Sequence, residues 1–222
     1  RRLFEQEQHI SNIVFMGMGE PLHNYDNLIP AIRLLLDGNG LNFSNRKVTV
    51  STVGLVPAIE RFGQEDFQVG LAVSLNATTD EVRDRIMPIN RRYNIETLLA
   101  CLKAFPLEKR RRVTIEYVLL SGVNDTEQDA RRLTKLLKGL PSKVNLIPWN
   151  SHEGSDFERP TRDSVDRFQR IVQDANYSCF VRETRGDEKM AACGQLGGGE
   201  KGVIPPRAKR RKEEPAPSGT SS

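Results

Sequence analysis

The chain has 222 residues, 37% of them hydrophobic, with a net charge of +4 and a pI of about 9.1. This length suits one large domain or two small ones. The longest apolar runs, such as residues 69–75, have the length of a strand, which excludes a membrane-spanning helix. Three widely spaced cysteines argue against a disulfide framework and predict a reducing, cytoplasmic location. Basic residues cluster at 91–92, 109–112 and 207–212, which suits a polyanion such as nucleic acid or simply a solvated surface.

Strand-like apolar segments alternate with helical segments along the chain. The expected strands are 12–16, 47–51, 69–75, 113–119, 144–147 and 179–182, and the expected helices are 28–37, 56–62, 79–86, 95–105, 127–137 and 164–176. Thr78 and Asn124 each stand three residues before a glutamate, which predicts capping boxes at two helix starts. The alternation predicts an α/β fold with a parallel sheet, either a barrel, a partial barrel or a doubly wound sheet.

The composition changes near residue 197. From there to the last residue the chain has almost no large apolar side chains, so burial cannot offset the entropy lost on ordering. We therefore expect one folded unit at residues 1–198 and a disordered basic tail at 199–222.

Four of the expected strands end in small or polar residues, where an apolar core should stop. They are Gly19, Glu20, Ser51, Ser74, Asn76 and Asn150. In α/β barrels the ligand binds at the carboxyl ends of the strands, so these residues should face one mouth. A carboxylate accepts from an amine, and hydroxyls and amides bind a carboxylate or a ribose, so the set suits a small zwitterion carrying a sugar. A single serine or asparagine after a strand is more often a turn residue or a helix cap.

The segments GMGEPL, VSTVG, VSLNA, NLIPWN and RGDEKMAACGQL occur in this order along the chain. In sequence and spacing they resemble the dual-specificity RNA adenine-C2 methyltransferases of the radical SAM superfamily, over residues 1 to about 200. The resemblance implies a partial (β/α)6 barrel that binds S-adenosylmethionine at the strand carboxyl ends. It also implies methylation of carbon 2 of adenine in 23S rRNA and in certain tRNAs, with electrons from an external donor. We expect a monomer that does not associate with a membrane.

The resemblance implies roles for individual residues. Gly19 and Glu20 match the pair that meets the amino end of the cofactor, and Ser51, Ser74, Leu75, Asn76 and Asn150 match further cofactor-binding positions. Cys193 matches the cysteine that becomes S-methylated and carries the methyl group to the RNA. Such a carrier needs a mobile, glycine-flanked loop, because its sulfur must reach the cofactor and then the base.

The superfamily binds a [4Fe–4S] cluster through a Cys-x3-Cys-x2-Cys motif, and this chain has no such run. Cys101 and Cys179, 78 residues apart, are expected to be buried core thiols instead. The family places the cluster motif and a second, resolving cysteine upstream of MGEPL. We therefore expect no metal ligand in this chain, cluster cysteines upstream of Arg1, and a C-terminal part of the enzyme that lacks the first barrel strand and is inactive alone.

Two alternatives remain open. The related C8-adenine rRNA methyltransferases share the scaffold, and the sequence separates them weakly from the C2 enzymes. A non-catalytic RNA-binding relic is compatible with the basic clusters, although it would not need Glu20, Ser51, Asn76 and Cys193 together. A methyltransferase with in-line transfer fits poorly, because the glycine-rich first loop of a doubly wound sheet is not seen.

Overall fold

The computed structural model describes residues 10–17, 19–151 and 155–182. In chain order the elements are β1 (Ile13–Phe15), η2 (Pro21–Asn24), α1 (Tyr25–Leu36), η3 (Asn45–Lys47), β2 (Val48–Thr52), α2 (Val56–Phe62), β3 (Gly70–Ser74), α3 (Asp80–Ile86), η4 (Pro88–Arg91), α4 (Ile95–Ala104), β4 (Val113–Leu119), α5 (Glu127–Leu136), β5 (Ser142–Pro148), α6 (Arg162–Asp174) and β6 (Ser178–Val181). Every strand and helix expected from the sequence is present. The largest difference is at α1, which begins at Tyr25 rather than at residue 28.

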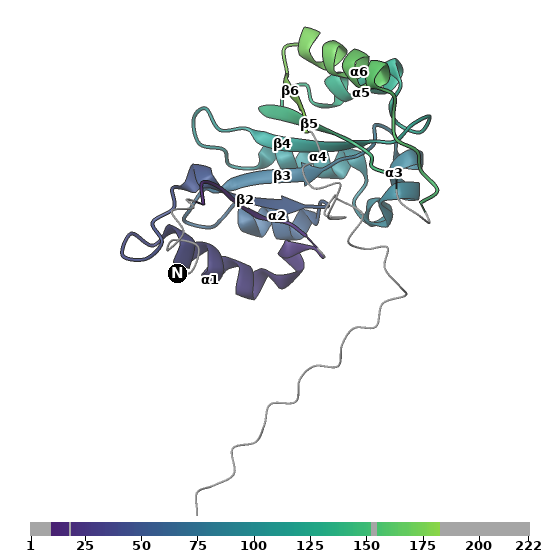
Figure 1. The fold of residues 1–222 in the computed structure, drawn as a ribbon. Coiled ribbons are helices and arrows are strands. Elements are labelled where there is room, and N and C mark those ends of the chain that lie inside the picture. Colours follow the sequence, from purple (N-terminus) through teal and green to yellow (C-terminus); the bar gives the residue numbers. More distant parts are fainter. Residues whose placement is uncertain (1–9, 18, 152–154, 183–222) are drawn as a thin grey trace, which may run out of the picture.

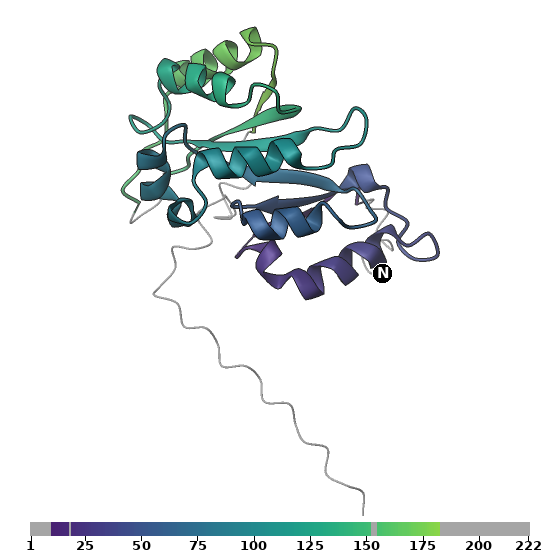
Figure 2. The same ribbon diagram turned by 180° about the vertical axis from the view of Figure 1, so that it is seen from behind.

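The six strands form one parallel sheet in the order β1-β2-β3-β4-β5-β6. A doubly wound sheet reverses its strand order at a switch point, and this sheet does not. Successive right-handed crossovers in one direction place the helices on one face of the sheet. Accordingly, α2 and α4 lie in front of the strands in Figure 2, while α4 is partly hidden behind them in Figure 1. The topology therefore selects the partial barrel over the doubly wound alternative.

The two faces of the sheet differ in chemistry. On the helix-covered face, strand residues such as Val50, Val73 and Ile115 pack with helix side chains in one buried core. Because side chains alternate along a strand, their neighbours Ser51, Ser74 and Glu116 point to the opposite face. Burial of branched side chains on the first face stabilises the sheet, and the second face is left for polar groups.

Two helix caps differ from the sequence prediction. Thr79, not Thr78, caps α3, and Thr126, not Asn124, caps α5 in a capping box with Asp129. The predicted residues are used elsewhere, because Thr78 donates to the Asp129 carboxylate (2.7 Å) and Asn124 bonds the ends of β3 and β4. In both cases a tertiary hydrogen bond replaced the local one that the spacing suggested.

Among the described residues, no helix is long and apolar enough to cross a lipid bilayer. Cys193, the expected tail at 199–222 and the expected boundary at residue 198 lie outside the described residues.

Candidate cofactor-binding site

Glu20 connects the ends of the first two strands. After β1, Gly17 and Gly19 adopt φ values of 143° and 147°, which side-chain-bearing residues rarely adopt. The chain then turns so that Glu20 caps η2, where its Oε1 accepts from the amide of Leu22 (3.0 Å). Its Oε2 accepts from the amide of Val53, just after β2 (2.8 Å). Both carboxylate oxygens are thereby fixed at the carboxyl edge of the sheet.

Glu20 keeps the capacity to bind a cation. A carboxylate offers about four acceptor sites, so two amide bonds leave about two for an ammonium group. Gly19 and Glu20 border a cavity of about 560 Å³ between the end of β1, η2 and α1. The other predicted residues do not line this cavity and lie farther along the strand ends.

Ser51 and Glu116 form a buried pair on the polar face. The Ser51 hydroxyl donates to the Glu116 carboxylate at 2.8 Å, and the register sets Ser74 beside Glu116. Because its proton is held by Glu116, the Ser51 oxygen is presented as an acceptor to a ligand donor such as a ribose hydroxyl. Sequence reasoning missed Glu116, although a carboxylate inside the apolar strand VTIEYVL was a usable signal, since buried charges require partners.

The buried side chain of Arg83 forms hydrogen bonds with the carboxyl ends of β2 and β3. Its side chain is 0% exposed. The guanidinium donates to the carbonyls of Val53, Ser74, Leu75 and Tyr93 and to the Asn90 side chain, at 2.9 to 3.3 Å. Burial lowers the pKa of Arg83 to about 10, against the opposing effect of Asp80 and Asp84, so the group stays charged at neutral pH. Sequence reasoning missed it, because nothing in α3 distinguishes Arg83 from the exposed Arg85.

Asn76 joins β3 to β4. It adopts a left-handed conformation (φ 57°), which asparagine tolerates better than most residues. Its Oδ1 accepts from the amide of Val118 (2.9 Å), and its carbonyl accepts from the buried Asn124 side chain (2.7 Å). Its Nδ2 contacts the sulfur of Met87 at 3.2 Å and retains a second hydrogen for a ligand. Asn124 was another residue that sequence reasoning used only as a cap.

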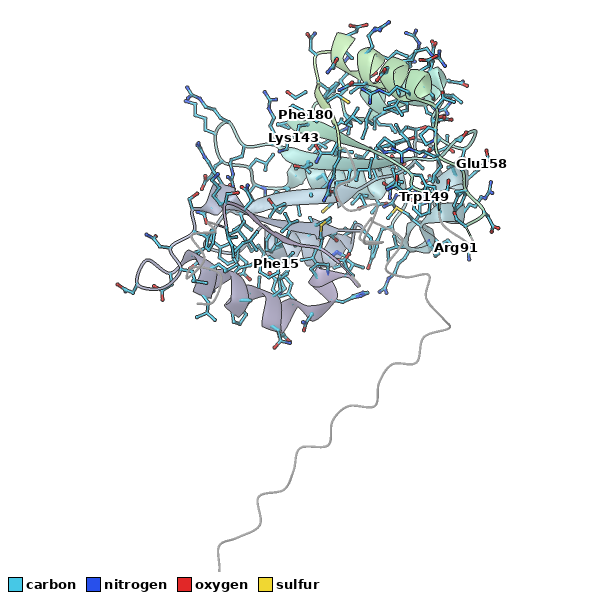
Figure 3. All side chains as sticks on the ribbon, in the orientation of Figure 1. Phe15, Arg91, Lys143, Trp149, Glu158 and Phe180 are labelled. Atoms are coloured by element: carbon cyan, nitrogen blue, oxygen red, sulfur yellow. The ribbon has the colours of Figure 1, made fainter. Side chains whose placement is uncertain are left out.

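Leu75 and Asn150 differ in what they can offer. Leu75 is fully buried, its amide donates to the carbonyl of Glu116 (3.0 Å), and its carbonyl accepts from Arg83 (3.0 Å) and Ala77 (2.8 Å), so its polar groups are already satisfied within the protein. Asn150 follows β5 and accepts from Arg159 through Oδ1 (2.6 Å). The adjacent Trp149 lies at the carboxyl end of the sheet in Figure 3, with Lys143 at the opposite end of β5.

The structure thus places the predicted residues at the carboxyl ends of the strands, where Glu20 and Asn76 each bond the end of the next strand and Ser51 bonds Glu116 of β4. Their cofactor-binding roles stay predictions. Cys193 lies outside the described residues. Cys101 and Cys179 are buried and free, which confirms the expectation of core thiols, and burial raises the pKa of Cys101 to about 11 and that of Cys179 to about 12.

The fold is an α/β partial barrel, a class of protein in which ligands bind at the carboxyl ends of the strands. The model of the radical SAM superfamily matches residues 1–134, and the chain belongs to this superfamily. It is 57% identical over 193 residues to the dual-specificity RNA methyltransferase RlmN of Pelobacter propionicus, covering 87% of this chain and 56% of that protein. The protein of the same name from Geobacter sulfurreducens is 56% identical, with 87% and 54% covered.

Two solved structures agree on the fold. A radical SAM methyltransferase from Sphaerobacter thermophilus superposes with a TM-score of 0.83 at 46% identity, covering 88% of this chain and 57% of that one. A domain of pyruvate-formate lyase-activating enzyme from Bacteroides vulgatus superposes with a TM-score of 0.59 at 18% identity, covering 78% and 99%, which shows likeness of fold alone. The chain spans about half the length of the curated relatives it matches.

Membership of the superfamily implies S-adenosylmethionine and a [4Fe–4S] cluster as cofactors. The carboxylate of Glu20, the hydroxyls of Ser51 and Ser74 and the amide of Asn76 fit the ammonium, carboxylate and ribose of S-adenosylmethionine. Within the described ranges, no group of three or more His, Cys, Asp or Glu side chains could hold a metal ion, so the cluster ligands are not found there.

Proposed function

We propose that this chain acts in the radical S-adenosylmethionine-dependent methylation of carbon 2 of adenine in 23S rRNA and in certain tRNAs. The observation that carries the proposal is the group of polar side chains Glu20, Ser51 and Asn76 at the carboxyl ends of the strands, in a chain whose relatives are named dual-specificity RNA methyltransferases. Carbon 2 of adenine is not nucleophilic, so ordinary transfer from a sulfonium does not serve it. When bound with its reduced cluster, the cofactor supplies the radical chemistry that such a carbon requires.

The residues of the chain divide the work of binding. Glu20 receives the ammonium of the cofactor, because its fixed carboxylate has unused lone pairs beside the cavity. Ser51 accepts from the ribose, because Glu116 holds its proton. Asn76 donates its remaining amide hydrogen to the cofactor, and Asn150 closes the same edge after β5. Cys193 carries the methyl group to the base, the role that the sequence resemblance gives it.

The experiment is product mapping with the intact native protein, reduced under anaerobic conditions and supplied with S-adenosylmethionine and substrate RNA. We expect 2-methyladenine by mass spectrometry with the unaltered protein and none with Cys193→Ala. Cys101→Ala is the matched control, because it removes a thiol that is buried away from the polar face and should leave product formation intact. An 8-methyladenine product would contradict the C2 assignment, and methylated RNA from Cys193→Ala would contradict the carrier role.

We further propose that the protein works as a monomer in the reducing cytoplasm and takes electrons from an external donor. The two free, buried thiols support a reducing location, because neither is paired in a disulfide. Sedimentation of the native protein at several concentrations tests the monomer, and a concentration-dependent dimer would contradict it.

A further inference from the structure

A second cavity lies at the amino ends of the strands, opposite the candidate cofactor site. It has a volume of about 450 Å³ and is bordered by residues at the starts of β2, β3, β4 and β5, namely Thr49, Gly70, Thr114 and Lys143. Figure 3 shows Lys143 at this end and Trp149 at the other. With about 3.3 Å per residue, the five steps along β5 from Lys143 to Pro148 separate the two ends by about 16 Å.

The cavity is lined by cations without carboxylates. Five of its lining residues are basic and none is acidic; the basic residues are Arg46, Arg110, Arg111, Arg112 and Lys143. In the described part of the chain none of the five forms an ion pair. Some arginines outside the cavity do form ion pairs, as Arg33 does with Glu65 and Asp66 at 3.0 and 2.8 Å. Uncompensated like charges gathered at a concave surface favour a ligand that brings negative charge.

The cationic loop between α4 and β4 is held in a defined conformation. Gln68 fastens it on both sides, donating to the carbonyl of Pro106 and accepting from the amide of Glu108, both at 2.8 Å. The Gln68 carbonyl also accepts from Arg111. Since these contacts use neutral oxygens, they position Arg111 without neutralising it. Hydrogen bonds thus position the loop and Arg111, while Arg46, Arg110 and Lys143 extend from the rim without side-chain hydrogen bonds to the described residues.

A rigid aromatic floor supports the site. Phe62 packs against Phe67 and Phe105 with ring centroids 6.0 and 6.5 Å apart, and all three line the cavity. Phe62 is buried in the core and cannot stack on a base. Phe67 and Phe105 are half-buried, and the charged rim supplies the groups that can bind an anion. Guanidinium groups bind phosphate oxygens through two parallel hydrogen bonds, which matches a rim that includes four arginines.

We propose that this basic cavity binds backbone phosphates of the RNA substrate at a segment remote from the adenine that is modified. The proposal rests on the proposed function, because it takes RNA as the substrate. A polynucleotide extends past both ends of a sheet that are about 16 Å apart, whereas a single nucleotide at the cofactor mouth does not. Phosphate contacts position a nucleic acid without reading its sequence, so the cavity orients RNA rather than selecting the adenine.

The test compares two charge-matched double variants of the intact native protein. Arg110→Gln with Lys143→Gln removes two charges from the rim, and both side chains are exposed or half-buried. Arg167→Gln with Arg170→Gln removes two exposed charges from α6, away from the cavity. RNA affinity is measured over a range of salt concentrations, together with circular dichroism to check folding. We expect roughly tenfold weaker binding for the rim variant, with a salt slope smaller by about 1.4 to 1.8, and no change for the α6 variant.

The outcomes separate this proposal from the proposed function. Methylation by the unaltered protein with unchanged RNA affinity and salt slope in the rim variant overturns the cavity proposal alone. Rim-dependent RNA binding without methyladenine supports the cavity and contradicts the proposed function. Adenosine monophosphate is tested as a competitor in parallel. If it binds the unaltered protein but not the rim variant, and RNA affinity does not depend on the rim, the site serves a small phosphorylated ligand and the RNA proposal is wrong.

Discussion

Charged side chains have different surroundings at the two ends of the sheet. At the carboxyl end, Glu20, Glu116 and Arg83 are each hydrogen-bonded to backbone groups or to a hydroxyl in or just after another strand. At the amino end, Arg46, Arg110 and Lys143 form neither ion pairs nor side-chain hydrogen bonds within the described residues. The first end is organised before any ligand arrives, which is how a small cofactor is positioned. The second end is completed only by a ligand that carries negative charge.

The largest expected effect is the destabilisation caused by replacing Arg83, whose guanidinium binds carbonyls at the ends of both β2 and β3. Replacing it with methionine leaves carbonyls of Val53, Ser74 and Leu75 buried without their donor. Such losses destabilise a protein by about 3 to 5 kcal/mol. Urea unfolding of the intact protein measures the change. Arg85→Met is the matched control, since Arg85 is exposed on the same helix, and equal stability of the two variants would contradict the assigned role.

The next effect concerns ligand binding by Glu20. Glu20→Gln keeps the size of the side chain but removes the charge and one acceptor for the amides of Leu22 and Val53. A charged hydrogen bond contributes about 1.5 to 3 kcal/mol, so affinity for S-adenosylmethionine should fall about tenfold to a hundredfold. Calorimetry on the intact protein checks this value. Glu81→Gln on the surface of α3 serves as the control. If Glu20→Gln binds S-adenosylmethionine as tightly as the unaltered protein does, the Glu20 carboxylate is not part of the cofactor site.

A smaller effect on stability should distinguish the loss of Ser51 from the loss of the Glu116 charge. Ser51→Ala leaves the buried Glu116 carboxylate without its hydroxyl donor, whereas Glu116→Gln retains an acceptor for Ser51. We expect Ser51→Ala to cost about 1 to 3 kcal/mol and Glu116→Gln to cost less. Unfolding of both single variants and of the double variant gives their coupling energy, which should be about 1 kcal/mol. Additive effects would show that the pair does not act as a unit.

The carboxyl end also shows what the sequence could predict. Strands and helices follow from apolar periodicity, which is local, so their bounds were found nearly correctly. The residues that fix the site were missed because each bonds at least one group that is distant in the chain, in addition to nearer groups in the cases of Arg83 and Asn124. Arg83 binds a carbonyl 30 residues away, Asn124 one 48 residues away, and Glu116 a hydroxyl 65 residues away. Of the three, only Glu116 left a trace, as a charge within an apolar strand.

A last effect is confined to alkaline pH and concerns the two buried thiols of the core. Burial raises the pKa of Cys101 to about 11 and that of Cys179 to about 12, above the ordinary thiol value of 9.0. Below pH 9 both thiols are protonated in the folded and the unfolded chain, so their contribution does not change. Above pH 9 the unfolded chain loses these protons first, and the free energy of unfolding falls as the pH rises toward the folded-state pKa values.

Urea unfolding at pH 8.0 and at pH 10.5 measures this effect in the intact protein and in a Cys101→Ala, Cys179→Ala double variant. The unaltered protein should lose more stability between the two pH values than the variant, because the variant has neither thiol to ionise. Tyrosine and lysine groups titrate in the same range but are common to both proteins, so their contribution cancels in the comparison. Equal losses in the two proteins would mean that the thiols are not shielded by the core, and that burial in the sheet and its helices is less complete than the structure shows.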